Sequence, residues 1–196
     1  MTICGERVLP QDDVLDRDVK PLAYNPEKAK QLLREYGKPV SFKLTVTATP
    51  RGRANGQIFQ DFWRAVGVNV ELLQIDQTTL VTKAFTREFD VTPWRIIDLA
   101  DPDVQMYANF RTGSPVNLSG YSDAELDKML EEARATADQG KRGELYCKIA
   151  DRINQHVQWF WTLENLYFSI AKPGLKGIPK QRSDEIDLSA AWWDKQ

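Results

Sequence analysis

The feature that most constrains the fold is a helix pattern followed directly by a strand pattern, near the start of the chain. Residues 24–38 read YNPEKAKQLLREYGK, which predicts a helix that Asn25 caps, that begins with Pro26 and that ends at Gly37. The next residues, SFKLTVTAT, alternate apolar and polar side chains and predict a strand at 42–48. The helix residues that recur at the spacing of one buried face are Ala29, Leu32, Leu33 and Tyr36.

This alternation of helix and strand continues toward the middle of the chain. Helices are predicted at about residues 54–66 and 78–87, and strands at 68–75 and 89–96. Pro93 places the third strand at a sheet edge or a bulge, because proline has no N–H to donate. The alternation predicts an α/β fold with a parallel or mixed sheet flanked by helices. The apolar residues expected to face inward from these helices are Ile58, Phe59, Phe62, Trp63, Val66, Leu80, Val81, Ala84 and Phe85.

The second half of the chain is richer in helix. Asp101 is expected to cap a helix that begins with Pro102 and runs to about residue 111. The tetrad SDAE at residues 122–125 has the form of a capping box and opens another helix. Gly140 separates that helix from one at 141–157. The residues available to their core faces are Leu126, Met129, Leu130, Ala133, Leu145, Ile149, Ala150, Ile153 and Val157.

An aromatic stretch, WFWTLENLYFSIA, follows the last of these helices. Its aromatic and β-branched residues predict a buried strand at 160–170. The aromatic side chains are interpreted as core residues rather than as a sugar-binding platform, and His156 as a residue at a helix end. Residues 24–171 are therefore expected to form one α/β domain and not two separate cores.

Composition argues against several classes of function. The chain has 196 residues and a formal net charge of −2, so it has no electrostatic reason to bind nucleic acid or an anionic membrane. No apolar run approaches the roughly 20 residues of a membrane span. His156 is the only histidine, so neither a metal centre nor a Ser-His-Asp triad has support. Two free thiols are the favoured state of Cys4 and Cys147, and a disulfide between them stays open.

Several stretches resemble a known family of receptors. YNPEKAKQLLREYG followed by a strand resembles the opening of the C-terminal lobe of the peptide/nickel-type solute-binding proteins of ABC transporters (family 5), the dipeptide- and oligopeptide-binding class. NLSGYSDAELDKMLEEARATAD resembles a later part of that lobe, where a loop with N-x-S-G-Y leads to a helix pair. KRGELYCKIADRINQHVQWFWTLENLYFSIAKPGLKGI continues the similarity to an aromatic strand and a P-G-L-K-G turn. Order and spacing match over roughly residues 24 to 178.

The resemblance implies that the chain supplies the C-terminal lobe of a periplasmic-binding-protein-like fold. Residues 1–23 would be the crossover from an N-terminal lobe, 24–171 the α/β ligand-binding lobe, and 172–196 a tail that returns toward the other lobe. Family members are longer and carry a leader, so the chain looks like a fragment. Its first residues, MTICGERVLPQDD, lack a basic start followed by an apolar run, and no signal peptide is expected in the chain as written.

The two ends of such a fragment would have lost their packing partner. Residues 1–20 and 180–196 are therefore expected to be mobile or to pack on a neighbouring chain. Trp192 and Trp193 give the tail an apolar patch for which no position within the chain is evident, and such patches favour association.

The resemblance also implies an extracytoplasmic or periplasmic receptor. It would capture a peptide or a similar small solute and deliver it to the permease subunits of an ABC importer, reaching the membrane only through them. Lobe closure around a ligand requires shape and charge complementarity, so no catalysis and no cofactor are expected. The alternative is the ligand-sensing domain of a transcription regulator, because this lobe is also found fused to such proteins. An enzyme that uses Asp98, Asp101 or Asp103 lacks a base and nucleophile at a recognisable spacing.

The stretch PWRIIDLADPD, residues 93–103, carries the main candidate ligand contacts. In relatives, the region after the third strand holds a tryptophan, a short spacer and an aspartate at the edge of the cleft, and the aspartate pairs with the α-amino group of a peptide. Trp94 and Asp98 match this pattern in kind, but they stand four residues apart where three is more usual. Arg95 takes the expected tryptophan position. A carboxylate at the C-terminal end of a strand also lies where α/β sheets usually place ligands.

Each of these residues has a structural alternative. Asp98 could only end the strand or cap a turn, and Asp101 is expected mainly to cap the next helix. Arg95 could bind a ligand carboxylate in bidentate fashion, or it could pair with Asp98. Trp94 could stack on a ligand or lie in the core.

A loop at NLSGY supplies the remaining candidates. Asn117 and Tyr121, with Ser119 between them, belong to a loop that lies close to the cleft in the family. Turn chemistry alone also explains an asparagine and a serine at such positions.

Overall fold

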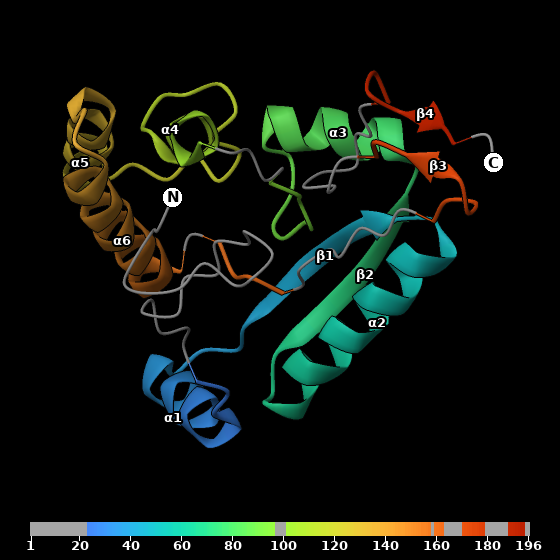
Figure 1. Ribbon diagram of the computed structural model, residues 1–196. Helices are drawn as coiled ribbons and strands as arrows, with labels where there is room; N and C mark the ends of the chain where they lie inside the picture. Colours follow the sequence, from blue (N-terminus) through green and yellow to red (C-terminus); the bar gives the residue numbers. More distant parts are fainter. Residues whose placement is uncertain (1–22, 97–100, 158, 163–169, 179–187, 195–196) are drawn as a thin grey trace.

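The computed structural model describes residues 23–96, 101–157, 159–162, 170–178 and 188–194. Figure 1 shows the elements in two groups: a pair of parallel strands with its covering helix, and a group of helices beside it. None of the helices in the described ranges is both long and apolar enough to cross a membrane.

The sheet is built around two parallel strands joined by a helical crossover. Strand β1 (Ser41–Thr47) pairs with β2 (Asn69–Ile75) along its whole length, and α2 (Pro50–Ala65) connects them. Two of the expected strands are therefore confirmed to within a residue or two at each end, and the α/β fold class with them. The parallel pairing follows from the helix between the strands, because a crossover returns the chain to the same end of the sheet.

The third expected strand, at 89–96, is wrong in extent: only Val91 forms a bridge, to Leu44 of β1. The backbone of Val91 exchanges two hydrogen bonds with β1. Side chains then replace the ladder on both sides, since Asp90 accepts from the Lys43 N–H at 2.8 Å and Thr92 Oγ1 donates to the Thr45 carbonyl at 3.1 Å. Pro93 follows and has no N–H to extend the pairing.

Helix α1 (Pro26–Tyr36) has the predicted ends. Asn25 Oδ1 accepts from the Lys28 N–H at 2.9 Å, and Gly37 adopts the left-handed conformation with φ 72°. The predicted buried face is wrong, because no residue of α1 is buried. Leu32 is 51% exposed and Tyr36 63% exposed, while Leu33 packs partly against the sheet.

Helix α2 begins at Pro50, capped by Thr49, four residues before the predicted start at 54. Its inward face also differs from the prediction, because Ile58 and Phe62 are exposed. Gly56 faces the sheet so closely that a Cβ there would lie 2.6 Å from Leu72 Cδ1. Buried Gln60 donates to the Val70 carbonyl at 2.6 Å. The expected contacts of Phe59, Trp63 and Val66 with the sheet are confirmed.

The remaining helices are α3 (Gln77–Thr86), α4 (Pro102–Phe110), α5 (Ala124–Ala135) and α6 (Gln139–His156). Asp101 caps α4 as predicted, by accepting from the Asp103 N–H at 2.9 Å. The capping box at 122–125 is displaced by one residue, since Asp123 and not Ser122 caps α5. Gly140 lies inside α6 instead of separating it from α5, because Asp138 caps that helix.

Most of the buried apolar residues that the structure describes belong to two clusters, and Leu80, Ala84 and Leu118 lie outside both; the prediction of one domain over residues 24–171 stays untested. The sheet cluster consists of Leu44, Val46, Val68 and Val70. The helical cluster consists of Phe110, Leu126, Leu130, Ala133, Leu145, Tyr146, Ile149 and Ile153.

Aromatic residues after α6 lie between the two clusters. Phe160 contacts Phe59 and Trp63 edge-on, with ring centroids 5.7 and 5.8 Å apart. Trp159 and Trp161 both contact Phe110 of the helical cluster. The predicted strand at 160–170 is not found in its described part, because residues 160–162 and 170 pair with no other strand. Residues 163–169 lie outside the described residues.

The C-terminal part forms a small antiparallel pair of β3 (Leu175–Lys176) and β4 (Trp192–Trp193). Trp192 and Trp193 thus have a backbone partner within the chain, contrary to expectation, although both side chains stay more than half exposed. Residues 1–22 and 179–187 lie outside the described residues, so the expectation for the ends is untested there. Cys147 is disulfide-bonded, which makes the favoured free thiol wrong for this residue.

Candidate functional site

A hollow of about 760 Å³ opens at the C-terminal end of β1. This is the edge of a parallel sheet at which α/β proteins usually place ligands. Its lining residues come from the end of β1, the start of α2, the helices α3 and α4, and the segments that follow these two helices. The lining residues are Thr47, Arg51, Gln77, Leu80, Phe85, Pro93, Trp94, Arg95, Val104, Gln105, Ala108, Asn109, Val116 and Leu118.

Trp94 and Phe85 form the aromatic part of the wall. Their rings meet edge to face, with centroids 6.1 Å apart and an interplanar angle of 87°. Phe85 was predicted to point inward as a core residue, yet it is 49% exposed on the hollow. Phe85 is exposed and Trp94 partly buried, and aromatic rings of this kind suit an apolar or planar part of a ligand.

Arg51 and Arg95 give the described wall its charge. Both residues line the hollow, and each also has an interaction within the chain. A guanidinium group presents a planar set of donors that matches a carboxylate in bidentate fashion.

Helix α4 supplies one wall through a single face. Val104, Gln105, Ala108 and Asn109 line the hollow at the spacing of one helix side. The amide of Asn109 is buried and donates to both the carbonyl and the side chain of Gln105, at 2.8 and 3.0 Å. The wall is thus preorganised by internal hydrogen bonds of α4.

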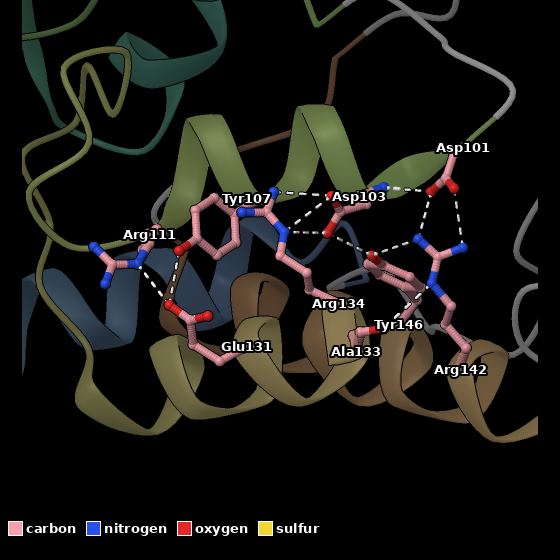
Figure 2. A network of polar contacts seen from close by, with 9 residues as sticks. All are labelled: Asp101, Asp103, Tyr107, Arg111, Glu131, Ala133, Arg134, Arg142 and Tyr146. Atoms are coloured by element: carbon pink, nitrogen blue, oxygen red, sulfur yellow. Dashed lines mark hydrogen bonds and ion pairs between the residues drawn. The ribbon is translucent and has the colours of Figure 1, made fainter. Parts of the chain in front are cut away.

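The opposite face of α4 is tied to α5 and α6 by the polar network in Figure 2. Arg142 binds the Asp101 carboxylate with two nitrogens at 2.7 and 3.0 Å, and Arg134 binds Asp103 with its closest contact at 2.8 Å. The hydrogen bonds from Arg142 hold the pKa of Asp101 below its usual value. Burial raises the pKa of Tyr146, whose hydroxyl donates to Asp103, to about 12.

The same network continues along α4 through Tyr107. Its hydroxyl donates to Glu131 at 2.7 Å, and Arg111 donates to the same carboxylate oxygen at 3.0 Å. The Arg134 guanidinium lies 3.4 Å from the centre of the Tyr107 ring, within the range of a cation–π contact. The acidic pair Asp101 and Asp103 therefore fixes α4 and does not line the hollow.

Asn117 shapes the loop between α4 and α5. It is 1% exposed, and its amide donates to the carbonyls of Arg111 and Tyr121 at 3.1 and 3.0 Å. Its side-chain oxygen accepts from Ser119 Oγ at 2.8 Å. The neighbours of Asn117 in sequence, Val116 and Leu118, line the hollow, so Asn117 supports this wall from behind.

Tyr121 lies at the end of the same loop and is not among the residues that line the hollow. Its hydroxyl lies 2.9 Å from His156 Nδ1, at the last residue of α6. His156 is thus at a helix end, as predicted. The structure brings Trp94 and Arg95 together in the hollow, while Asn117 and Tyr121 lie behind or beside it; Asp98 lies outside the described residues.

Several lining residues were missed by sequence reasoning. Thr47 ends β1, and its position at the C-terminal end of a parallel strand was a usable signal. Gln105 and Asn109 carried none, because the face that α4 turns to the hollow depends on how its other face packs; Leu118, in the loop after α4, carried none either. In the described residues, no group of three or more His, Cys, Asp or Glu side chains is placed to hold a metal ion.

Comparison with known proteins identifies this architecture. The model of the family "Bacterial extracellular solute-binding proteins, family 5 Middle" matches residues 7–117. Di/tripeptide-binding protein 1 of Pseudomonas aeruginosa (strain UCBPP-PA14) is 28% identical over 153 residues, which are 72% of this chain and 28% of that protein. The dipeptide-binding protein of Escherichia coli (strain K12) is 30% identical over 141 residues, which are 66% of this chain and 26% of that protein.

A solved structure agrees with the fold. The dipeptide binding protein from Pseudoalteromonas sp. SM9913, in complex with Met-Leu, superimposes with a TM-score of 0.72 at 20% identity and covers 87% of this chain. The chain spans 36% of that structure and about a quarter of the two bacterial relatives above. Members of the matching family are extracellular solute-binding proteins of bacteria. The match covers more than half of the sequence, and the chain therefore belongs to the bacterial extracellular solute-binding proteins of family 5.

Proposed function

We propose that this chain forms part of an extracytoplasmic receptor that captures a peptide, and that delivers it to the permease subunits of an ABC importer. The observation that carries the proposal is the hollow at the C-terminal end of β1, where Trp94 and Phe85 stand beside Arg95. An apolar wall with a few convergent polar groups is the usual form of a small-molecule site. Relatives that carry dipeptide or di/tripeptide in their names support the class of ligand.

A peptide of two or three residues matches the chemistry of this wall. Its terminal carboxylate would bind the guanidinium of Arg95, and an apolar side chain would contact Trp94 and Phe85. Its α-amino group would pair with Asp98, which precedes α4 in the sequence. No step of capture requires a bond to form or break, so the proposal includes no catalysis and no cofactor.

The test is a titration of this chain, labelled with ¹⁵N, with a dipeptide such as Met-Leu. Because the hollow is open on one side, we expect a weak dissociation constant of about 1 mM, equivalent to about −4 kcal/mol. Chemical-shift changes should be confined to the lining, including the indole N–H of Trp94 and the side-chain amide of Gln105. N-acetylation or C-amidation of the peptide should weaken these changes. Shifts scattered over the surface, or the same response to a neutral sugar, would contradict the proposal.

Asp98→Asn should weaken binding of a free-amine dipeptide in a protein that carries both lobes. Asparagine keeps the shape and some hydrogen bonding but removes the charge that would offset an enclosed ammonium group. A charge-assisted hydrogen bond of about 1.5–3 kcal/mol corresponds to a loss of roughly 10- to 150-fold in affinity. Calorimetric titration measures this loss, and thermal unfolding should stay nearly unchanged. An N-acetylated dipeptide is the matched control, and it should bind the unchanged protein and Asp98→Asn equally. If the free-amine peptide also bound both proteins equally, Asp98 would be a turn residue without ligand contact.

A further inference from the structure

Arg87 occupies a backbone conformation that its residue type rarely adopts. It follows α3 as the C-terminal cap, with φ 58° and ψ 32°, and its N–H donates to the Ala84 carbonyl at 3.2 Å. Glycine is the usual residue at such a left-handed cap, because a Cβ makes the conformation costly. An arginine at this position therefore makes the end of α3 less stable than a glycine would.

The side chain of Arg87 reaches from α3 to the loop that follows α4. Its Nη2 donates to the carbonyl of Asn117 at 3.1 Å. The stem passes Gly120, where a Cβ would lie 3.4 Å from Arg87 Cδ and where φ is 66°. The Asn117 carbonyl also accepts from the Gly120 N–H at 3.1 Å. The same oxygen therefore binds both the guanidinium group of Arg87 and the backbone of the loop's own turn.

This contact joins the two walls of the hollow. Leu80 and Phe85 of α3 line the hollow, and so do Val116 and Leu118 of the loop. Arg87 stands two residues after Phe85, and Asn117 stands between the two lining residues of the loop. None of these four lining residues belongs to the sheet cluster or the helical cluster of the described residues, so the hydrogen bond from Arg87 is a direct link between α3 and the loop.

We propose that Arg87 is a positioning residue of the ligand site. By holding the Asn117 carbonyl, it keeps the loop against α3 and so sets the width of the hollow and the size of peptide that it accepts. The inference deepens the proposed function and rests on it. It assigns to Arg87 a role in selecting between dipeptides and longer peptides, without direct contact with the ligand.

Arg87→Gly in the complete 196-residue chain separates this role from a merely structural one. The substitution removes the guanidinium and at the same time supplies the residue that a left-handed cap favours, so the melting temperature should not fall. Val157→Gly is the matched control, because Val157 caps α6 with φ 49° and does not line the hollow. Both variants relieve the same backbone conformation, but only the first opens the link between the walls.

Two measurements are made on each protein. Methyl relaxation dispersion without ligand should show new microsecond-to-millisecond motion at Val116 and Leu118 in Arg87→Gly alone. Titration with the dipeptide Met-Leu and the tripeptide Met-Leu-Ala should show an affinity loss of about 3- to 10-fold for the dipeptide, because binding must then order the loop, and a smaller loss for the tripeptide. Val157→Gly should bind both peptides as the unchanged chain does.

The outcomes separate this inference from the function on which it rests. If the unchanged chain binds Met-Leu and Arg87→Gly shows neither new motion nor a changed dipeptide-to-tripeptide ratio, the role of Arg87 is overturned and the proposed function stands. If none of the proteins binds either peptide, the proposed function fails and ligand selection by Arg87 fails with it. If both glycine variants changed loop motion and peptide affinity equally, the cause would be the backbone substitution and not the lost guanidinium, and the inference would also be overturned.

Discussion

Phe110→Ala should lower the stability of the helical cluster by about 3–5 kcal/mol, the usual cost of deleting a large buried aromatic ring. Phe110 is 1% exposed and lies at the end of α4. Its ring contacts Trp159 and Trp161, with centroids 5.7 and 6.5 Å away. The truncation would leave a cavity among α4, α5 and the aromatic residues that follow α6.

The loss should be unequal along the chain, because the buried residues form two clusters. Residue-resolved hydrogen exchange should show the full loss of protection at Leu130 and Ile149, and a smaller loss at Val46 and Val70 in the sheet. Phe85→Ala is the matched control, since Phe85 is 49% exposed on the hollow and its removal should cost less than about 1 kcal/mol. Equal loss of protection in both clusters would mean that they unfold as one unit.

Local signals in the sequence predicted the helix ends well. Asn25, Gly37 and Asp101 act within their own turn of chain, so residue type and position are enough to assign them. The start of α2 at Thr49 and Pro50 carried the same kind of signal and was missed. The start of α5 was placed one residue early, because Asp123 and not Ser122 has an arginine partner on α6.

Buried faces were predicted less well, since they depend on distant residues. The apolar residues of α2 are spread over more than one side, and the close approach of Gly56 to Leu72 decides which side faces the sheet. The apolar stripe of α1 includes Leu32 and Tyr36, which meet no partner in the described residues that would bury them. Periodicity predicts that a helix has an apolar face, but not what covers that face.

The candidate site was located in the correct region and only partly in its residues. Trp94 and Arg95 line the hollow because they follow the bridge of Val91 to β1 at the C-terminal edge of the sheet. Asn117 is near the hollow, but its side chain is used by the loop. The lining residues of α4 were not predictable, since the ion pairs of Asp101 and Asp103 with distant arginines determine how this helix is turned.

Asp123→Ala should destabilise the chain by about 3–4 kcal/mol at neutral pH. The carboxylate of Asp123 accepts from the N–H groups of Glu125 and Leu126 at the start of α5, at 3.0 and 3.1 Å. It also binds Arg152 of α6 through two nitrogens at 2.6 and 2.8 Å. A lost N-cap costs about 1 kcal/mol, and breaking an ion pair whose carboxylate is buried and whose arginine is partly exposed adds about 2–3 kcal/mol, because the Asp123 contacts of Arg152 are lost.

Two further substitutions separate the cap from the ion pair. Asp138→Ala removes the N-cap of α6, whose side chain accepts from the Lys141 N–H at 2.8 Å, and should cost only about 1 kcal/mol. Asp123→Asn keeps a capping oxygen but loses the charge, so it should fall between the two alanine variants. If Asp123→Ala cost no more than Asp138→Ala, Arg152 would contribute nothing to the folded state.

The effect of Asp123→Ala should also depend on pH, in a direction that follows from the ion pair. The hydrogen bond from Arg152 and the N–H groups of α5 hold the pKa of Asp123 below its ordinary value near 3.8. A carboxyl group with a lowered folded-state pKa stabilises the fold fully above its unfolded pKa, and this contribution disappears as pH falls through the folded pKa. The difference between the unchanged chain and Asp123→Ala in urea unfolding should therefore be constant from about pH 5 to 7 and shrink below about pH 4. A difference that stayed constant down to pH 2 would mean that the neutral side chain caps α5 as well as the carboxylate does, and that the charge on Asp123 is irrelevant to stability.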